Sequence, residues 1–369
     1  MQIGATHYRS IWLADDAWRV QIIDQRRLPH ELLIRRLETL DDAVQAIRDM
    51  QVRGAPLIGA TAAYGLCLAV RQDPSECSLT EAAQALKAAR PTAVNLSWAV
   101  DNLASKIAEL PCSDRCSAAY ALSAELCDAD VATNRAIGEH GLALLRKQVS
   151  PSGDSKPINV LTHCNAGWLA TVDWGTALAP IFMAHDAGLA IHVWVDETRP
   201  RNQGASLTAW ELQQQGIPHT LIVDNAGGHL MQHGLVDLCI TGADRVTRCG
   251  DACNKIGTYL KALAAHDNGV PFFVALPSST IDWGIRDGIR EIPIEKRPDD
   301  EVTWIQGVDA RDRARRIRVS PKNTRVRNDA FDVTPARLVS GLITERGVCA
   351  ASESGLGRLF PEKRSGAVA

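Results

Sequence analysis

Two side chains that can take part in proton transfer follow short apolar runs in the second half of the chain. Cys164 lies in HCNAGWLAT (163–171), after the run INVLTH, and Asp244 lies in TGADRV (241–246), after the run VDLCIT. A thiol needs a shifted pKa to be reactive, whereas a carboxylate at a strand end suits acid–base catalysis. A buried structural cysteine and a turn-capping aspartate are the simpler alternatives, and the residue types alone leave both open.

Two segments of the first half carry arginines that could bind an anion. VRGAPLIGATAAYG (52–65) combines Arg53 with Gly54 before a helical pattern, which resembles a phosphate cradle. It lacks the GxxxxGK[ST] spacing of a nucleotide-binding P-loop, so it does not predict a nucleotide site. Arg90 precedes Pro91 and the segment NLSW, and an ordinary surface arginine is the simpler interpretation there.

Two loops of the second half are further candidates for an anion site. DETRPRNQGASLTAWEL (196–212) crowds polar side chains in front of a predicted helix, although a solvated loop with a helix cap is the simpler alternative. In CGDACNKIGTYLKAL (249–263), we expect Asn254 and Lys255 to open an amphipathic helix. A lysine and the free N–H groups of a helix start would suit a phosphate.

Metal and dinucleotide motifs are incomplete. His229 and His233 have the spacing of two metal ligands on one helix, but the glutamate of HExxH is absent. Two C-x3-C pairs do not form a convincing zinc set, and no GxGxxG follows a predicted strand. We therefore expect no metal and no cofactor. The two cysteine pairs are Cys112/Cys116 and Cys249/Cys253.

Apolar runs alternate with helical patterns after Pro157, which is typical of a parallel sheet covered on both faces. In such sheets ligands bind beyond the carboxyl ends of the strands, and the second-half loops described above occupy those positions. The predicted strands are 158–163, 190–196, 219–223, 236–241 and 271–276, and helical patterns cover 174–187, 205–215 and 253–266.

The first half of the chain has a different pattern. Up to about Arg36 it is typical of short strands with a turn, including WRVQIID (18–24), and apolar residues then recur at helical spacing. The polar segment 148–157 is rich in Pro, Gly and Ser and is the best candidate for a linker. We expect a small-sheet and helical domain at 1–150 and a parallel-sheet domain at 151–369. Alanine-rich helical segments are expected at 59–70, 81–90, 97–108 and 117–147.

Composition narrows the class of protein. The chain has 369 residues, which suits two domains, and its formal net charge of −3 provides no large basic field for nucleic acid or a membrane surface. It has no apolar run of about 18 residues, and its first residues lack the pattern of a signal peptide. We therefore expect a cytoplasmic protein whose ten cysteines are reduced thiols.

Taken together, these segments resemble the S-methyl-5-thioribose-1-phosphate isomerase family of methionine salvage. The matches keep one order and span most of the chain, so the resemblance is specific. The family belongs to a wider group that includes the regulatory subunits of a eukaryotic translation-initiation exchange factor, which share the fold without the isomerase activity. The matching segments are VRGAPLIG (52–59), NLSWAV (95–100), LTHCNAG (161–167), ETRPRNQGASLTAWEL (197–212), DNAGGHLMQHG (224–234), TGADRV (241–246), GDACNKIGTYLKALAA (250–265), IPIEKRP (292–298) and FDVTPARLVSGLITERGV (331–348).

The resemblance implies an α/β enzyme that converts 5-methylthioribose 1-phosphate into 5-methylthioribulose 1-phosphate without a cofactor. Cys164 would stabilise the transition state or relay a proton, and Asp244 would be the proton donor. The resemblance also implies an N-terminal domain of small sheet plus helices, a C-terminal Rossmann-like domain and a homodimer. The substrate-binding residues that it implies are Arg53, Gly54, Ala55, Arg90, Gln203, Asn254 and Lys255.

Two alternative functions stay open at this point. The enzyme could act on another pentose 1-phosphate, either 5-deoxyribose 1-phosphate or ribose 1,5-bisphosphate. The chain could instead be a non-catalytic regulatory subunit, but the presence of both Cys164 and Asp244 argues against that class.

The charge available in the site predicts a preference at C5 of the sugar. We expect an uncharged substituent to be preferred, because the basic residues assigned to the site are committed to the C1 phosphate and a second buried phosphate would need partners of its own. Arg199 and Arg201 are the exceptions, since the sequence leaves their orientation open. Apolar side chains around Pro56, Leu57 and Trp98 are expected to line the methylthio end of the pocket.

Overall fold

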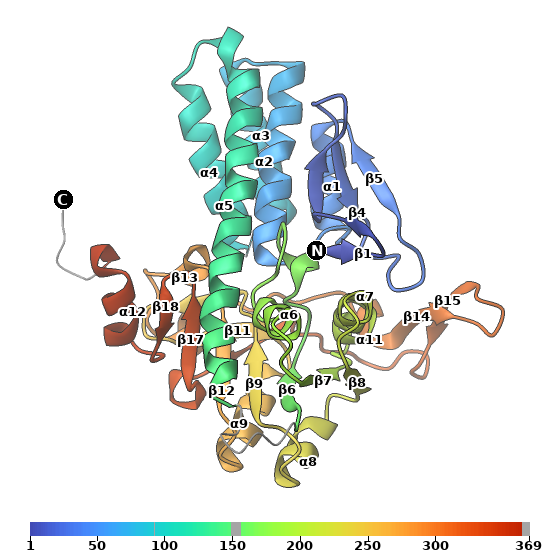
Figure 1. The fold of residues 1–369 in the computed structure, drawn as a ribbon. Helices are drawn as coiled ribbons and strands as arrows, with labels where there is room; N and C mark the ends of the chain where they lie inside the picture. Colours follow the sequence, from blue (N-terminus) through green and yellow to red (C-terminus); the bar gives the residue numbers. More distant parts are fainter. Residues whose placement is uncertain (92, 149–155, 364–369) are drawn as a thin grey trace.

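The structure is a computed structural model that describes residues 1–91, 93–148 and 156–363. Figure 1 shows a bundle of helices beside a small N-terminal sheet, both standing on a half of the molecule that is built around a larger sheet. The predicted linker at 148–157 falls largely outside the described residues.

Short antiparallel strands and five helices form the N-terminal half. The strands are β1 (Gln2–Ile3), β2 (Thr6–His7), β3 (Ile11–Leu13), β4 (Val20–Ile23) and β5 (Ile34–Leu37), and the helices are α1 (Leu40–Arg48), α2 (Ala55–Gln72), α3 (Glu76–Ala89), α4 (Val94–Ala108) and α5 (Cys112–Arg146). A capping box between Thr39 and Asp42 satisfies free N–H groups at the start of α1. Helix α2 is buried along most of its length, because α1, α3, α4 and α5 all pack against it. Its nearly continuous apolar sequence matches this central position.

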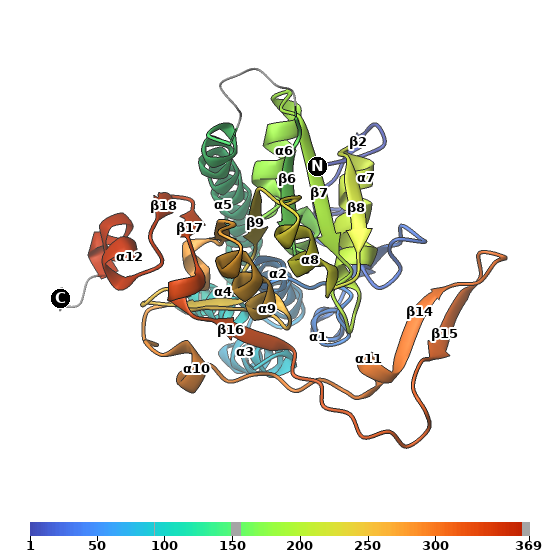
Figure 2. The same ribbon diagram turned by 90° about the horizontal axis from the view of Figure 1, so that it is seen from below.

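A seven-stranded sheet forms the core of the second half and confirms the Rossmann-like expectation. Its order is β18-β17-β12-β9-β6-β7-β8, and every pair is parallel except β17 with β18. Val160 and Leu161 alternate between two apolar clusters, and α5 and α6 cover one face while α8 and α9 cover the other (Figure 2). The elements are β6 (Ile158–Thr162), α6 (Ala179–Asp186), β7 (Ile191–Asp196), α7 (Ala209–Gln214), β8 (His219–Ile222), α8 (Ala226–Gln232), β9 (Leu238–Thr241), α9 (Thr258–Asp267), β12 (Phe272–Ala275), β17 (Gly341–Thr344), β18 (Gly347–Cys349) and α12 (Glu353–Leu359).

A second, four-stranded sheet lies beside the first and includes Asn254 and Lys255, which were expected in a helix. Its order is β13-β10-β11-β16, with β10 (Arg245–Thr247), β11 (Ala252–Lys255), β13 (Ile281–Asp282) and β16 (Phe331–Thr334). The prediction that Asn254 and Lys255 open a helix was wrong: both lie in β11, paired with β16. The helix α9 begins only at Thr258, after Gly257 turns the chain with φ of 102°.

The remaining elements of the second half are short. The hairpin of β14 (Trp304–Val308) and β15 (Ala314–Arg318) projects from the body of the molecule (Figure 2). Two one-turn helices precede it, α10 (Gly288–Glu291) and α11 (Asp300–Thr303).

Helix α5 connects the two halves of the molecule. Ala119 and Cys127 near its start belong to the helical core, whereas Ile137 and Leu145 near its end belong to the core beside the large sheet. Gly141 permits close contact with α6, because a Cβ there would lie 2.3 Å from a side-chain carbon of Pro180. The N-terminus is also tied to the second half, since the Met1 amino group lies 2.7 Å from Oδ1 of Asp173.

Two sequence expectations concern the chain as a whole. All ten cysteines lie in the described part of the chain and are free, as predicted. Among the helices formed by the described residues, none combines the length and the apolar character needed to span a membrane.

Candidate active site

The predicted reactive residues lie where the strand order of the large sheet reverses. The chain passes from β6 to β7 on one side and from β9 to β12 on the other, while β6 and β9 are neighbours. Cys164 follows β6, and Asp244 follows β9. The connections that leave the carboxyl ends of these two parallel neighbours run to opposite sides of the sheet. A crevice forms between them, which is the usual ligand site of such sheets.

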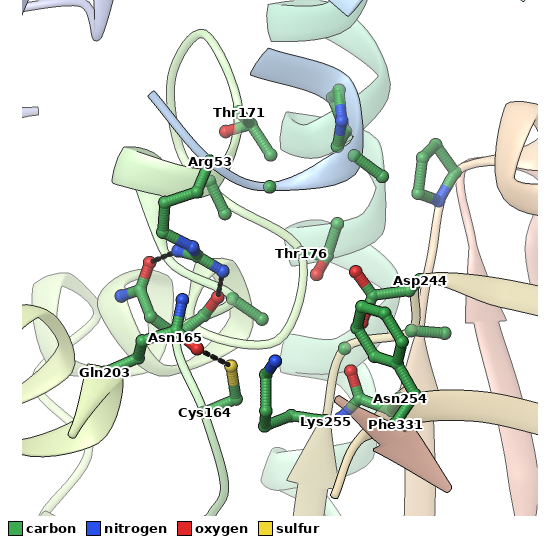
Figure 3. A pocket seen from close by; sticks show the side chains of 18 of the residues that line it. Arg53, Cys164, Asn165, Thr171, Thr176, Gln203, Asp244, Asn254, Lys255 and Phe331 are labelled. Atoms are coloured by element: carbon green, nitrogen blue, oxygen red, sulfur yellow. Dashed lines mark hydrogen bonds between the residues drawn. The ribbon is translucent and has the colours of Figure 1, made fainter. Parts of the chain in front are cut away.

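A single pocket at this crevice brings together all nine residues assigned to the site from the sequence. Figure 3 shows Cys164 and Asp244 on two sides of the pocket, with the Lys255 side chain extending between them. Sequence reasoning did not assign several further lining residues, although Asn165 and Phe331 lie in segments that match the family. The predicted residues are Arg53, Gly54, Ala55, Arg90, Cys164, Gln203, Asp244, Asn254 and Lys255, and the added ones include Met50, Asn165, Thr176, Pro277 and Phe331.

Cys164 is held in a left-handed backbone conformation, with φ of 68°. Its N–H donates to Oγ1 of Thr198 at 2.8 Å, and its carbonyl oxygen accepts from Oγ1 of Thr208 at 2.7 Å. The Sγ atom lies 3.5 Å from Oε1 of Gln203. Burial raises the pKa of the Cys164 thiol, even though Arg53 and Lys255 oppose this effect. The side chain is therefore a neutral thiol near pH 7, which can donate a proton.

Asp244 lies in the turn between β9 and β10, where its N–H donates to the carbonyl oxygen of Cys253 at 2.9 Å. Burial raises the pKa of the Asp244 carboxyl, and the positive charges of Lys255, Arg90 and Arg53 only partly offset this. A carboxyl group with a raised pKa can hold a proton closer to neutral pH, as a general acid must.

The Arg53 guanidinium is fixed from one side. Its Nη2 donates to the carbonyl oxygen of Asn165 at 2.7 Å, and its Nη1 donates to Oδ1 of the same residue. Its Nε is buried without a partner. The adjacent Gly54 has φ of +95°, and a Cβ there would lie 2.2 Å from the carbonyl oxygen of Ala170, so only glycine lets the loop approach this closely.

Arg90 and Lys255 complete a group of three cations. Nη2 of Arg90 donates to Oε2 of Glu295 at 2.8 Å, and its Nε is also buried without a partner. Lys255 lies 4.5 Å from the ring centroid of Phe331 and forms no ion pair with any residue that the structure describes. Burial lowers the pKa of the Lys255 ammonium. Buried donors left unpaired cost free energy, so this arrangement suits an anion that accepts from all three side chains.

Glu211 is a site residue that the sequence did not reveal. Its carboxylate accepts from Nδ2 of Asn165 at 2.8 Å and from the N–H of Trp168 at 2.9 Å. Burial raises the pKa of Glu211 to about 7. Gly167 is needed here, since a Cβ would lie 1.8 Å from the Glu211 carboxylate. The sequence offered one sign of a buried carboxylate, because Glu211 directly follows Trp210 within a predicted helix.

One expectation about the edge of the site was wrong. Leu57 is fully buried in the helical core, and Trp98 lines a separate cavity, so neither borders the pocket, although Pro56 does. The sequence left the orientation of Arg199 and Arg201 open. Neither lines the pocket: Arg199 donates to the carbonyl oxygen of Val302, and Arg201 pairs with Glu301 beside a larger neighbouring cavity.

A cluster of possible metal ligands lies behind the site. Donor atoms of His163, Asp196 and Asp224 lie within 4.8 Å of one another. The Lys261 ammonium, however, lies 3.2 Å from Oδ2 of Asp196, and it also donates to the carbonyl oxygen of Asp224. A lysine cation already neutralises this cluster, so an ion-pair network is the better interpretation.

Comparison with known proteins shows the family of this chain. Residues 51–351 match the Initiation factor 2 subunit family. The methylthioribose-1-phosphate isomerase of Paramagnetospirillum magneticum is 61% identical over 363 residues, which cover 98% of this chain and 100% of that protein. The chain belongs to the methylthioribose-1-phosphate isomerase family. The resemblance found in the sequence motifs is thereby confirmed.

Two solved structures of this wider group share the fold. The 5-methylthioribose 1-phosphate isomerase from Pyrococcus horikoshii gives a TM-score of 0.83 at 37% identity, covering 98% of this chain and 100% of that one. The translation initiation factor eIF-2B, subunit delta, from A. fulgidus gives 0.79 at 37% identity, covering 96% and 100%. Both structures are 37% identical to this chain, although one is named an isomerase and the other an initiation factor. The fold therefore does not distinguish an isomerase from an initiation factor. The sequence relatives and the site residues must do so.

Proposed function

We propose that the protein converts 5-methylthioribose 1-phosphate into 5-methylthioribulose 1-phosphate, an aldose–ketose isomerisation of methionine salvage. The observation that carries the proposal is the convergence of three cations on the pocket that also contains Cys164 and Asp244. Arg53 and Arg90 each keep a buried donor for a ligand, and Lys255 has no ion-pair partner among the described residues. A phosphate ester placed beside a proton donor fits both features.

The chemistry of the substrate defines what the site must do. Phosphate on the anomeric oxygen prevents the sugar from opening spontaneously to an aldehyde. In our proposal Asp244 donates a proton to the ring oxygen as the bond to C1 breaks, and Cys164 relays a proton or stabilises the transition state near the C2 hydroxyl. Burial raises the pKa of both groups, which favours their protonated, proton-donating forms.

Hydrogen can move from C2 to C1 by two routes. In one route a base removes the C2 proton to give an enediol-type intermediate, which is reprotonated at C1. In the other route a hydride shifts directly from C2 to C1, and the C2 hydroxyl loses its proton to form the ketone. In either route we assign the departing proton to the Asp244 carboxylate, which is ionised once it has protonated the ring oxygen.

The substrate-binding roles follow from position in the pocket. We assign the phosphate to Arg53, Arg90 and Lys255, with Gly54 and Ala55 providing close backbone approach. We assign Gln203 and Asn254, which also line the pocket, to the hydroxyl groups of the sugar. A larger cavity of about 370 Å³ shares Met50, Arg53 and Gln203 with the pocket. We propose that the methylthio end of the substrate points toward Met50 at this junction.

Direct assay of the purified protein tests the proposal. Incubation with methylthioribose 1-phosphate should give the ketose, detected by NMR, without any added cofactor. In D2O, solvent deuterium at C1 of the product indicates the proton-transfer route, and its absence indicates the hydride shift. Absence of any ketose would favour the regulatory-subunit alternative.

Assembly, location and domain division are also parts of the proposal. The family resemblance supports a homodimer, and the composition supports a cytoplasmic location with no nucleic-acid or membrane partner. We propose a domain division near residue 150, at the end of the helix that connects the two halves. Light scattering of the purified chain tests the dimer, since a monomer mass would contradict it.

A further inference from the structure

A chain of ion pairs leads away from the pocket through the segment IPIEKRP (292–298). Arg90 pairs with Glu295 at 2.8 Å, and Glu295 pairs with Arg297 at 2.9 Å. Arg297 pairs with Glu301 at 2.7 Å. The proposed function gives no role to this segment, although it is one of the motifs that the sequence shares with the family.

The surroundings hold Glu295 in place. Its carbonyl oxygen accepts from the N–H of Ala330 at 2.9 Å, and the N–H of Arg297 donates to the carbonyl oxygen of Asn328 at the same distance. The side chains of Arg90 and Glu295 are only 11% and 18% exposed, so the pair is largely protected from solvent. A protected, charge-assisted pair restricts a guanidinium more strongly than an exposed one does.

The position of Arg90 depends on this carboxylate. Glu295 is the partner of its guanidinium in the described part of the chain, where the Nε atom stays buried and unpaired. A free arginine has many rotamers, and fixing one of them on binding costs conformational entropy. Glu295 removes that cost in advance, because it already holds the guanidinium at the pocket wall.

The charge of Glu295 also acts at Asp244. The positive charges of Lys255, Arg90 and Arg53 favour the ionised form of Asp244, and Glu295 opposes them. Without Glu295, the positive charges of Lys255, Arg90 and Arg53 would act on the Asp244 carboxyl, and the negative charge that opposes them would be lost. The groups that interact with Asp244 are Arg53, Arg90, Lys255, Glu295, Cys164 and Cys253.

We propose that Glu295 is a positioning residue of this site, which holds the Arg90 guanidinium at the pocket and offsets its charge at Asp244. The proposal rests on the proposed function, because it assigns Arg90 to the phosphate and Asp244 to proton donation. Arg297, held in turn by Glu301, pairs with the same carboxylate and also contacts Met50 at the pocket.

Two substitutions test the negative charge of Glu295 and its hydrogen bond with Arg90 separately. Glu295→Gln keeps an oxygen that can accept from Arg90 but removes the negative charge. The pKa of Asp244 should then fall, and the basic limb of the pH profile of kcat/KM should move to lower pH by roughly 0.5–1 unit. This is near the lower end of the pKa shifts that a neighbouring charge causes. Glu295→Asp keeps the charge but shortens the side chain. It should raise KM by about three- to tenfold, as for one weakened charge-assisted hydrogen bond, with little movement of the pH profile.

Glu38→Gln is the matched control, since Glu38 is an exposed carboxylate that pairs with Arg19 at 2.9 Å away from the pocket. It should leave both quantities unchanged. A merely structural Glu295 would lower activity in both variants without moving the pH profile. The proposal is overturned if Glu295→Gln keeps the wild-type profile, or if Glu38→Gln shifts it equally.

Binding of inorganic phosphate, measured by calorimetry, gives a readout that does not depend on isomerase activity. Glu295→Asp should weaken phosphate binding about three- to tenfold, and Glu38→Gln should not change it. Wild-type protein that binds phosphate but forms no ketose would contradict the proposed function alone. Equal phosphate affinity in wild type and Glu295→Asp would contradict the role of Glu295 in holding Arg90.

Discussion

The Arg53 guanidinium donates to the carbonyl oxygen of Asn165, the residue that follows Cys164 in the chain. The Arg53 guanidinium and the Cys164 thiol are therefore fixed by the same short loop. Glu211 holds this loop from behind through the Asn165 amide. A shift of the loop would move both groups together, so the distance between the guanidinium and the thiol is set by local structure.

We predict that Cys164→Ser and Asp244→Asn each lower kcat far more than they raise KM. Loss of an acid–base group costs ~10²–10⁴ in rate, whereas the phosphate contacts stay in place. Steady-state kinetics with purified variants provide the measurement. Cys77→Ser and Asp101→Asn, at exposed positions outside the pocket, are matched controls. Near-normal turnover in either site variant would remove that residue from the mechanism.

We predict that Glu211→Gln raises KM about tenfold with a smaller effect on kcat. An amide has one accepting oxygen, whereas the carboxylate accepts from Asn165, Trp168 and Leu169. At least one buried donor then loses its partner, which costs ~1–3 kcal/mol and loosens the Asn165 loop. Unchanged KM would show that the loop does not need Glu211.

The same substitution should change the pH dependence of stability. Burial raises the pKa of Glu211 to about 7 in the folded state, above the ordinary value of about 4.3 in unfolded chains. Protonated Glu211 thus favours the folded state at low pH, and this contribution is lost as pH rises from about 4.5 to 7. The unfolding free energy of wild type relative to Glu211→Gln should fall by up to about 3 kcal/mol over that range. Denaturant titrations at several pH values measure it, and a constant difference would contradict the raised pKa.

We predict that Lys255→Met lowers kcat/KM for the sugar phosphate by ~10- to 100-fold, since charge-assisted hydrogen bonds contribute ~1.5–3 kcal/mol. A crystal structure with bound product gives the direct check. The phosphate should then lie within hydrogen-bonding distance of Arg53, Arg90 and Lys255. A phosphate bound elsewhere would refute the assignment of all three.

Sequence reasoning chose residues that lie in one pocket, because the candidate site is formed at strand ends. Cys164 and Asp244 each follow an apolar run, and parallel strands bring such ends to one edge of a sheet. The sequence did not reveal Glu295 or Glu211, because each acts through a contact with a distant segment. Lys255 was placed on the wrong element, since the four-residue strand β11 has no alternating pattern and its partner β16 comes much later in the chain.

We predict that activity survives exhaustive chelation and needs no added nucleotide. Lys261 already neutralises the cluster of His163, Asp196 and Asp224. The side chain of His233 uses Nδ1 in a hydrogen bond with the carbonyl oxygen of His229 at 2.8 Å. The measurement is kcat before and after dialysis against a chelator. Loss of activity that zinc restores would overturn this prediction.

The last prediction concerns the substituent at C5 of the sugar. A methylthio group gains from apolar burial, at ~0.8 kcal/mol per methylene-sized unit, and Met50 offers such a surface at the junction of the two cavities. A second phosphate dianion would need its own partners, since an unpaired buried charge costs several kcal/mol. Arg199 is engaged with the carbonyl oxygen of Val302, and Arg201, which lines the larger cavity, is engaged with Glu301.

We therefore expect kcat/KM to be highest for methylthioribose 1-phosphate and lowest for ribose 1,5-bisphosphate. The value for 5-deoxyribose 1-phosphate should be about 10- to 200-fold below the highest, because a hydrophobic pocket discriminates weakly against a missing group. The three substrates are compared under one set of conditions, in wild type and in Arg201→Gln. Because Arg201 is engaged with Glu301, the variant should leave the order unchanged. A bisphosphate that reacts best would contradict the substrate assignment. If Arg201→Gln then abolished that preference, Arg201 would have left Glu301 to bind the second phosphate.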